Sequence, residues 1–294
     1  MMIRGNNRIV DAVIYCMLAV VAFFSMAPIL NTLAISFSGK VAAMSGQVYF
    51  WPVDLNVSAY KQVLGDRDFF RSFGVSVERV LLGGAINFII TVLMAYPLAK
   101  SAKLFPGRNI YMWFIVFCML FSGGLIPWYM TIHSLGLLDK IWALVLPTAV
   151  PVFNVILLMN FFKGIPKELE EAANMDGAGP WKTLFMVFVP VSLPALAAVT
   201  LFSIVGHWNA FFDGMILMQH KENWPLQTYI QQLIVNLSSI MNTTDPEEVK
   251  RLSNISSQLL NAAKVMVSMV PIMLIYPFLQ KYFVSGIVLG AVKE

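Results

Sequence analysis

Six long apolar stretches dominate this chain of 294 residues and restrict it to folds that a lipid bilayer accepts. Each is long enough to cross about 30 Å of hydrocarbon. Backbone groups in lipid must be hydrogen-bonded within the segment, and these stretches lack the alternation of a barrel strand, so each predicts a transmembrane helix. The sequence therefore predicts an all-α integral membrane protein with six spans. They lie near residues 9–35, 75–99, 111–130, 141–162, 183–206 and 264–284.

The composition supports lipid as the main solvent. Only 12% of the residues are charged and 58% are hydrophobic, whereas a soluble domain carries about 25% charged residues. The net charge of +4 comes from basic residues spread over several loops, so no nucleic-acid partner is expected. Cys16 and Cys118 lie in apolar runs, where neither a disulfide nor a metal site is expected.

The N-terminal apolar run is expected to stay in the mature protein. Arg4 and Arg8 precede it, as in a signal peptide. The run is, however, longer than the 7–15 residues of a signal core and lacks a clear cleavage site. We interpret it as the first span.

Charge in the short loops predicts the orientation. The link at residues 100–110 holds Lys100, Lys103 and Arg108 and no acid, which predicts a cytoplasmic location. The link at 131–140 carries only one charge of each sign and is expected outside. Six spans then place both termini and the 163–182 loop in the cytoplasm. The expected parts are an N-terminal helix with an external segment (1–74), a five-span core (75–284) with an external loop at 214–263, and a cytoplasmic tail (285–294).

The loop at residues 165–182 is unusually polar for this chain and predicts a short surface helix. Pro166 suits the first turn, Lys167–Asp176 are good helix formers, and Gly177 allows the φ > 0 stop. Pro180 then suits the start of the next helix. One narrow face of small side chains follows i, i+3, i+4, i+7 spacing and permits close approach of another surface: Leu169, Ala172, Ala173 and Asp176.

The same loop carries a recognisable pattern: Glu171-Ala172-Ala173, three residues, Gly177, nine residues, then Val187-x-Val189-Pro190. This resembles the signature loop of ATP-binding-cassette (ABC) importer permeases, with valines where isoleucine and leucine are usual. The resemblance implies that the loop is the coupling helix, which fits a cleft in a cytoplasmic ATPase. The implied ATPase-coupling residues are Glu171, Ala172, Ala173, Asp176 and Gly177.

Other segments extend the resemblance along the chain. They are similar to carbohydrate-uptake permeases of the type I importer fold, near the smaller, six-span subunit of the maltose permease. The stretch that begins at Trp224 further resembles the Gram-positive branch that handles polysaccharide-derived oligosaccharides. The segments are Ala95–Lys100, Phe105–Arg108, Ile126–Tyr129, Leu135–Asp139, Trp142–Pro147, Trp208–Phe211 and Trp224–Tyr229.

The resemblance implies a multi-pass subunit of a bacterial plasma-membrane importer. Its partners are expected to be a second, non-identical permease subunit, two ATPase subunits, and an extracellular or lipid-anchored binding protein that delivers a carbohydrate. ATP and Mg²⁺ are expected on the ATPase, and no cofactor on this chain. The Gly177–Thr183 run looks like a phosphate-binding loop, but Trp181 stands where that loop needs glycine before Lys182.

Polar and aromatic residues inside the spans are candidates for the sugar pathway, because intramembrane polar groups are costly. Amides and acids bind sugar hydroxyls, and aromatic rings cover apolar sugar faces. Helix–helix hydrogen bonds or an interfacial aromatic belt explain the same residues without a ligand. The candidates are Trp128, Tyr129, Asn154, His207, Trp208, Asn209 and Asp213.

Two prolines, Pro190 and Pro194, predict a bend in the fifth span.

Two other classes of protein are less consistent with the sequence. An ion-coupled secondary transporter usually has charged residues deep in its spans, whereas Glu78, Arg79 and Asp213 lie near the ends of predicted spans. A membrane enzyme needs a catalytic motif, but His133, His207 and His220 show no metal-ligand spacing and no nucleophile motif appears. No catalytic residue is predicted.

Overall fold

The computed structural model describes residues 8–242 and 258–291, which form helices and no strand. The all-α prediction is confirmed. The charged stretch at 245–251 of the expected external loop lies outside the described residues. The helices are α1 (Arg8–Ser36), α2 (Lys40–Met44), α3 (Ser58–Gly65), α4 (Arg67–Ala99), α5 (Arg108–Leu120), α6 (Leu125–Ser134), α7 (Ile141–Val145), η1 (Leu146–Thr148), α8 (Val152–Lys163), α9 (Lys167–Met175), α10 (Pro180–Thr183), the π-helix η2 (Leu184–Phe188), α11 (Val189–Val191), α12 (Leu193–Asn209), α13 (Phe212–Leu217), η3 (Lys221–Asn223), α14 (Leu226–Asn242) and α16 (Gln258–Ala291).

The described helices provide up to six spans, as predicted. Three helices are long and apolar enough to cross a bilayer alone: Val10–Ser36, Arg67–Ala99 and Gln258–Pro277. Three bent pairs of helices bring the number to six if each pair forms one span. Their bends are 112° between α5 and α6, 44° between the α7–η1 segment and α8, and 85° between the α10–α11 segment and α12.

Local sequence explains the sharpest bends. The third predicted span, 111–130, is not one straight helix, because α5 ends at Leu120 and Gly124 takes a φ of +87° before α6 begins. A φ in that range is open to glycine at no steric cost. The bend in the fifth span falls at Ser192, between Pro190 and Pro194, so the proline prediction is confirmed.

Helix α4 begins at Arg67, well before the predicted start at residue 75. Its first two turns contain Arg67, Asp68 and Arg71, which are too polar for hydropathy to join them to the span. The helix of 33 residues is about 50 Å long. Arg79 therefore lies within α4, more than three turns after the helix begins.

The chain divides into two compact units. The smaller comprises Met1–Arg67 and Gln232–Met269. In it, the Asn31 amide donates to the carbonyls of Val48 and Tyr49 at 3.1 and 2.7 Å. The Lys264 ammonium, which is almost fully buried, pairs with Asp66 at 2.6 Å. These contacts fold the segment after α1 back onto α1 and tie α16 to the end of the α3 segment.

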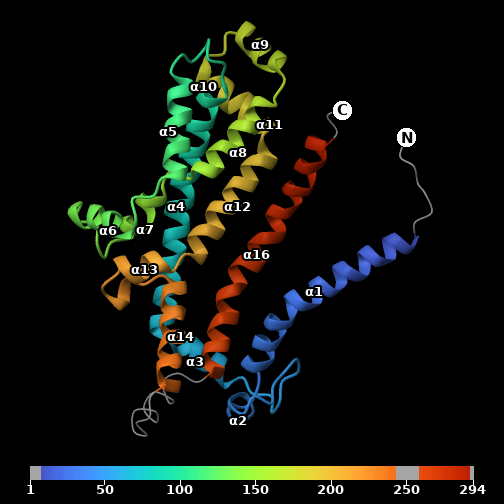
Figure 1. The fold of residues 1–294 in the computed structure, drawn as a ribbon, viewed down its shortest axis with the longest axis vertical. Helices are drawn as coiled ribbons and strands as arrows, with labels where there is room; N and C mark the ends of the chain where they lie inside the picture. Colours follow the sequence, from blue (N-terminus) through green and yellow to red (C-terminus); the bar gives the residue numbers. More distant parts are fainter. Residues whose placement is uncertain (1–7, 243–257, 292–294) are drawn as a thin grey trace. The chain divides into compact units, whose positions relative to one another are not determined.

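The larger unit comprises Asp68–Gln231 and Val270–Glu294. Its main core lies between α4, α5, α8, η2 and α12, and α9 lies at one end of these helices (Figure 1). A second, smaller cluster joins α6, α7 and α13. The main core is built from Val92, Ala95, Leu98, Ile115, Val155, Leu158, Met159, Phe162, Ile165, Leu184, Phe188, Ala195, Leu196 and Val199.

Candidate functional site

Helix α9 has the boundaries that its sequence predicts, within one residue. It begins at Lys167, directly after Pro166, and ends before Gly177, whose φ is +73°. The Gly177 N–H donates to the Asn174 carbonyl at 3.0 Å and the Ala178 N–H to the Ala173 carbonyl at 2.9 Å. This pair of bonds is the Schellman ending, which needs a left-handed residue at the glycine position. The helix end is therefore encoded locally.

Helix α9 turns most of its motif residues outward. None of its residues is buried. Glu171 and Ala172 are exposed, as are Leu169 and Asp176, and Ala173 is half-buried. An exposed helix face of small side chains lets a second surface approach the backbone closely.

A largely buried cation fastens α9 to the end of α4. The Lys100 ammonium lies 2.6 Å from the Glu170 carboxylate, the residue before the motif. The same ammonium lies 4.1 Å from the ring centroid of Tyr96 on α4 and 4.4 Å from that of Phe188 on η2. Lys100 is only 13% exposed, and such a cation held over two rings is attracted to their π-faces. The Lys100 ammonium thus joins α9 to both α4 and η2.

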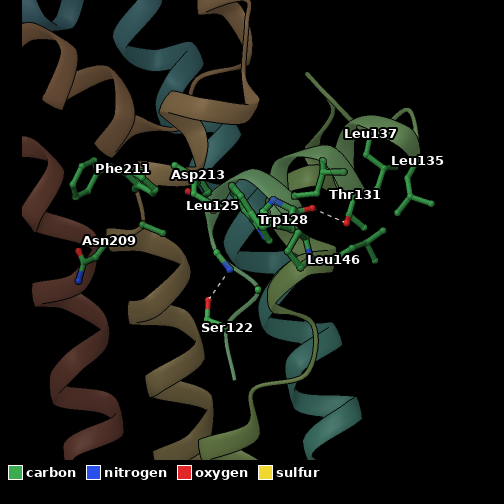
Figure 2. Close-up of a pocket in the computed structure, with 17 residues that line it drawn as sticks. Ser122, Leu125, Trp128, Thr131, Leu135, Leu137, Leu146, Asn209, Phe211 and Asp213 are labelled. Atoms are coloured by element: carbon green, nitrogen blue, oxygen red, sulfur yellow. Dashed lines mark hydrogen bonds between the residues drawn. The ribbon is translucent and has the colours of Figure 1, made fainter. Parts of the chain in front are cut away.

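A large, mainly apolar pocket of about 950 Å³ lies elsewhere in the larger unit, between α6, η1 and the α12–α13 link. Three of the seven predicted pathway residues line it together: Trp128, Asn209 and Asp213 (Figure 2). Phe211 and Phe212 add aromatic surface. The pocket thus offers rings, one amide and one carboxylate.

The carboxylate in this pocket belongs to a buried ion pair. Both guanidinium Nη atoms of Arg79 donate to Asp213, one of them at 3.1 Å. Arg79 Nη1 also donates to the Ala210 carbonyl at 3.3 Å and Nη2 to that of Leu144 at 3.5 Å. Arg79 is 1% exposed. It joins α4 to α7 and to the α12–α13 link, and it partly neutralises the acidic group of the pocket.

The other predicted pathway residues lie in helix contacts. The Asn154 amide donates to Ser203 Oγ at 3.0 Å and to the Val199 carbonyl at 3.1 Å, which ties α8 to α12. Trp208 is buried edge-on against Phe73, and Tyr129 packs with the α6–α7–α13 cluster. The structure does not bring these side chains to the pocket that Trp128, Asn209 and Asp213 share.

His207 lies in a contact that the sequence does not reveal. It is buried, and its Nε2 lies 3.3 Å from the Asn87 side-chain amide of α4. A Cβ added at Gly83 would come within 2.4–2.8 Å of the His207 ring. The glycine therefore creates the space that the imidazole fills between α4 and α12.

Sequence reasoning missed Arg79 as a structural partner of the pocket. The available signal was an arginine and an aspartate inside an otherwise apolar chain, since isolated charges in spans are rare.

Comparison with known proteins gives a consistent result. A family model described as "Binding-protein-dependent transport system inner membrane component" matches residues 72–289. The chain is 36% identical over 288 residues to the "Polygalacturonan/rhamnogalacturonan transport system permease protein YtcP" of Bacillus subtilis, covering 98% of this chain and 99% of that protein. It is also 36% identical to "Protein LplC" of the same organism, covering 98% and 96%.

One solved structure is similar over almost the whole fold. It is a chain of a bacterial ABC transporter "involved in the import of the acidic polysaccharide alginate". The TM-score is 0.83 at 32% sequence identity, and the match covers 96% of this chain and 99% of that one.

Proposed function

The chain belongs to the binding-protein-dependent transport system inner membrane components, within which it is an ABC permease for sugars and oligosaccharides, and on this premise we propose that α9 is the surface on which its ATPase acts. ATP binding would close two ATPase subunits in the cytoplasm, and α9 would move with them. The spans would then rock between inward-facing and outward-facing states.

The observation that carries this proposal is the construction of α9. Its motif face is exposed, its end is fixed by the left-handed Gly177, and its opposite side is clamped to α4 through Lys100 and Glu170. A helix that is free on one side and rigidly joined to a span on the other suits the transmission of force.

The test is a double variant, Glu171→Ala with Gly177→Ala, in the assembled transporter. Alanine is strained at a φ of +73°, so the helix end and the motif charge are lost together. We expect uptake to fall at least tenfold while the chain stays in the membrane. The matched control is Glu168→Ala with Gly179→Ala, because Glu168 is exposed on the same helix and Gly179 has a negative φ with open space around it. Normal uptake in the first double variant contradicts the coupling role.

We further propose an acidic oligosaccharide as the substrate. One relative at 36% identity is a permease for polygalacturonan and rhamnogalacturonan, and the solved structure at 32% identity belongs to a transporter for alginate. These three polysaccharides contain uronic acids. Uptake of a labelled galacturonate oligomer in proteoliposomes, with and without an excess of a neutral arabinose oligomer, tests the class. Competition by the neutral oligomer as strong as by unlabelled galacturonate argues against it.

The proposed assembly contains a second, non-identical permease subunit, two ATPase subunits that hold ATP and Mg²⁺, and a binding protein outside the cell. The family description names dependence on a binding protein. Purification of the tagged chain from its native membrane, followed by mass spectrometry, is expected to recover the second permease subunit and the ATPase. Recovery of this permease with no ATPase, together with uptake abolished by a protonophore, favours the ion-coupled transporter instead.

A further inference from the structure

A cationic pocket of about 440 Å³ lies where α4 and α8 end and where α5 and α9 begin. Its charged lining holds four cations and two carboxylates, which leaves an excess of positive charge. These residues are Lys100, Arg108, Lys163, Lys167, Glu170 and Glu171.

Much of this positive charge is not used within the protein. Lys100 is paired with Glu170. Arg108 donates from Nε to the Leu98 carbonyl at 2.8 Å and from Nη1 to the Asn109 side-chain oxygen at 3.4 Å, and within the described part of the chain no carboxylate forms an ion pair with it. Among the residues that the structure describes, the Lys163 and Lys167 ammonium groups have no hydrogen bond or ion pair. The pocket therefore has charge available for an anion.

An apolar groove of about 630 Å³ begins beside this pocket, on the same helices. On α4 the groove reaches Leu98, next to Ala99 and Lys100 of the cationic pocket. On α5 its first residue is Tyr111, one helical turn after Arg108. The cationic pocket and the groove are thus neighbours on both helices.

The groove runs along the helices. Its lining on α5 follows i, i+3, i+4, i+7 spacing from Tyr111 to Cys118, a single stripe of that helix. On α4 it takes Leu93 and Met94, then Pro97 and Leu98 one turn later. Phe114 in this stripe is 64% exposed. The apolar groove matches the acyl chain of a phospholipid, and the unpaired cations at its end match the phosphate of the headgroup.

We propose that these two surfaces form one binding site for an anionic phospholipid such as phosphatidylglycerol. The phosphate lies among Lys163, Lys167 and Arg108, and one acyl chain lies in the α4–α5 groove. Basic pockets at the ends of membrane helices favour anionic headgroups over zwitterionic ones. The zwitterionic choline headgroup carries a cation of its own, which this pocket repels.

The first test measures lipid binding and does not depend on transport. The full chain, purified with its partner subunits and stripped of lipid, is titrated with phosphatidylglycerol and with phosphatidylcholine of the same acyl chains, and retained lipid is counted by native mass spectrometry. We expect phosphatidylglycerol to bind preferentially, and Lys163→Gln with Lys167→Gln to weaken it about fivefold per charge. Phosphatidylcholine binding is expected not to change.

The matched control is Lys103→Gln with Lys182→Gln, which removes two lysines outside the pocket lining. If this control weakens binding as much as the pocket variant, the lipid responds to bulk charge and the site is refuted. Equal binding of the two lipids also refutes it. If a variant loses the ATPase from the complex, that result concerns the proposed function of α9. The lipid measurement can still be interpreted, because lipid is counted on the permease itself.

The groove is tested by a phosphatidylglycerol analogue with a photoreactive group on one acyl chain. We expect crosslinks concentrated on the peptides that contain Met94, Phe114 and Cys118. Crosslinks spread evenly over all apolar helices overturn the groove assignment. A crosslink from Cys118 to another subunit, formed by a bifunctional thiol reagent, also overturns it, since a partner helix would then occupy the groove.

Discussion

Arg79 shows most clearly how a single residue shapes this protein, because it places a fully buried cation against a carboxylate that lines the large pocket. Taking one partner from such a pair leaves the other charge buried and uncompensated. Asp213→Ala is therefore expected to destabilise the chain by about 3–5 kcal/mol. The control is Asp68→Ala, which breaks the half-exposed pair with Lys221 and is expected to cost less than about 1 kcal/mol. Denaturation midpoints in detergent compare the two; equal losses contradict the role of Arg79.

Gly83 is a second residue whose role depends on one neighbour, because the His207 ring leaves no space for a side chain at this position. An added Cβ meets the His207 ring at 2.4–2.8 Å, so Gly83→Ala is expected to destabilise the chain by about 1–3 kcal/mol through overpacking. Gly74→Ala on the same helix meets nothing within 4 Å and is expected to be neutral or stabilising. A double variant with His207→Ala is expected to recover part of the loss, and a strictly additive cycle counts against the steric explanation.

These residue-scale features differ in how far sequence reveals them. Gly177 is predictable because a helix ending depends on residues a few positions away. The Arg79–Asp213 pair joins residues 134 positions apart, and only the packing of α4 against the α12–α13 link brings them together. Asn154 and His207 illustrate the same limit. Their polarity marks them correctly as exceptional, but whether they contact a ligand or a neighbouring helix depends on tertiary structure.

At the scale of elements, one ammonium joins α9 to the end of α4. Removing Lys100 removes its ion pair with Glu170 and its contacts with two aromatic rings. Lys100→Ala is expected to weaken the attachment of α9 by about 1–2 kcal/mol. Hydrogen exchange of residues 167–175 is expected to accelerate accordingly, while Lys103→Ala, which removes an exposed lysine of the same loop, leaves it unchanged. Unaltered exchange in Lys100→Ala shows that other contacts fix α9.

A second contact between elements, the one that Asp139 makes with residues 219 and 220, is expected to depend on pH. Asp139 accepts hydrogen bonds from the backbone N–H groups of Gln219 and His220 at 3.1 and 3.2 Å, and from the His220 ring. Partial burial acts to raise the pKa of Asp139, but hydrogen bonds from His220 and Asn223, together with the charge interaction with His220, outweigh it and lower that pKa below its ordinary value. When the pKa of a carboxyl group is lower in the folded state than in the unfolded state, its ionised form stabilises the folded contact at any pH above the unfolded-state pKa. That stabilisation is lost as the pH falls through the folded-state pKa.

Protection of residues 135–140 and 217–224 against hydrogen exchange is therefore expected to hold at neutral pH and to fall in acid. Asp139→Asn is expected to lose both the protection and its pH dependence. If Asp139→Asn keeps the same acid-induced opening, another group controls this contact.

The helices that cross the membrane are predictable from the sequence, because hydrocarbon requires long apolar helices. The bends and the polar ends of helices are less predictable. Six apolar stretches correspond to six possible spans because hydrocarbon tolerates little else. The break at Gly124 has a local signal, yet the 112° turn that follows depends on where α6 finds packing partners in α7 and α13. The early start of α4 was missed because its first turns are charged and leave no mark in hydropathy.

At the scale of the whole molecule, the length of α4 can be compared with the thickness of the membrane. Asp68 near its start pairs with Lys221, and Lys100 just after its end pairs with Glu170 of α9. The helix between them is about 50 Å long, whereas the hydrocarbon core is about 30 Å thick. If α4 crosses the membrane, the Lys221 segment and α9 are therefore expected on opposite sides of it. The basic link at 100–110 predicts that the α9 side is cytoplasmic.

This topology is testable with a membrane-impermeant thiol reagent in a chain that carries Cys16→Ser and Cys118→Ser. Met175→Cys on α9, an exposed position, is expected to react only in inverted vesicles. Gln219→Cys, beside the Lys221 segment, is expected to react only in right-side-out vesicles. Reaction of both positions from the same side refutes α4 as a full span. The reverse pattern keeps the span but inverts the chain, and α9 then lies where no ATPase reaches it, so this one measurement decides whether the coupling proposal is topologically possible.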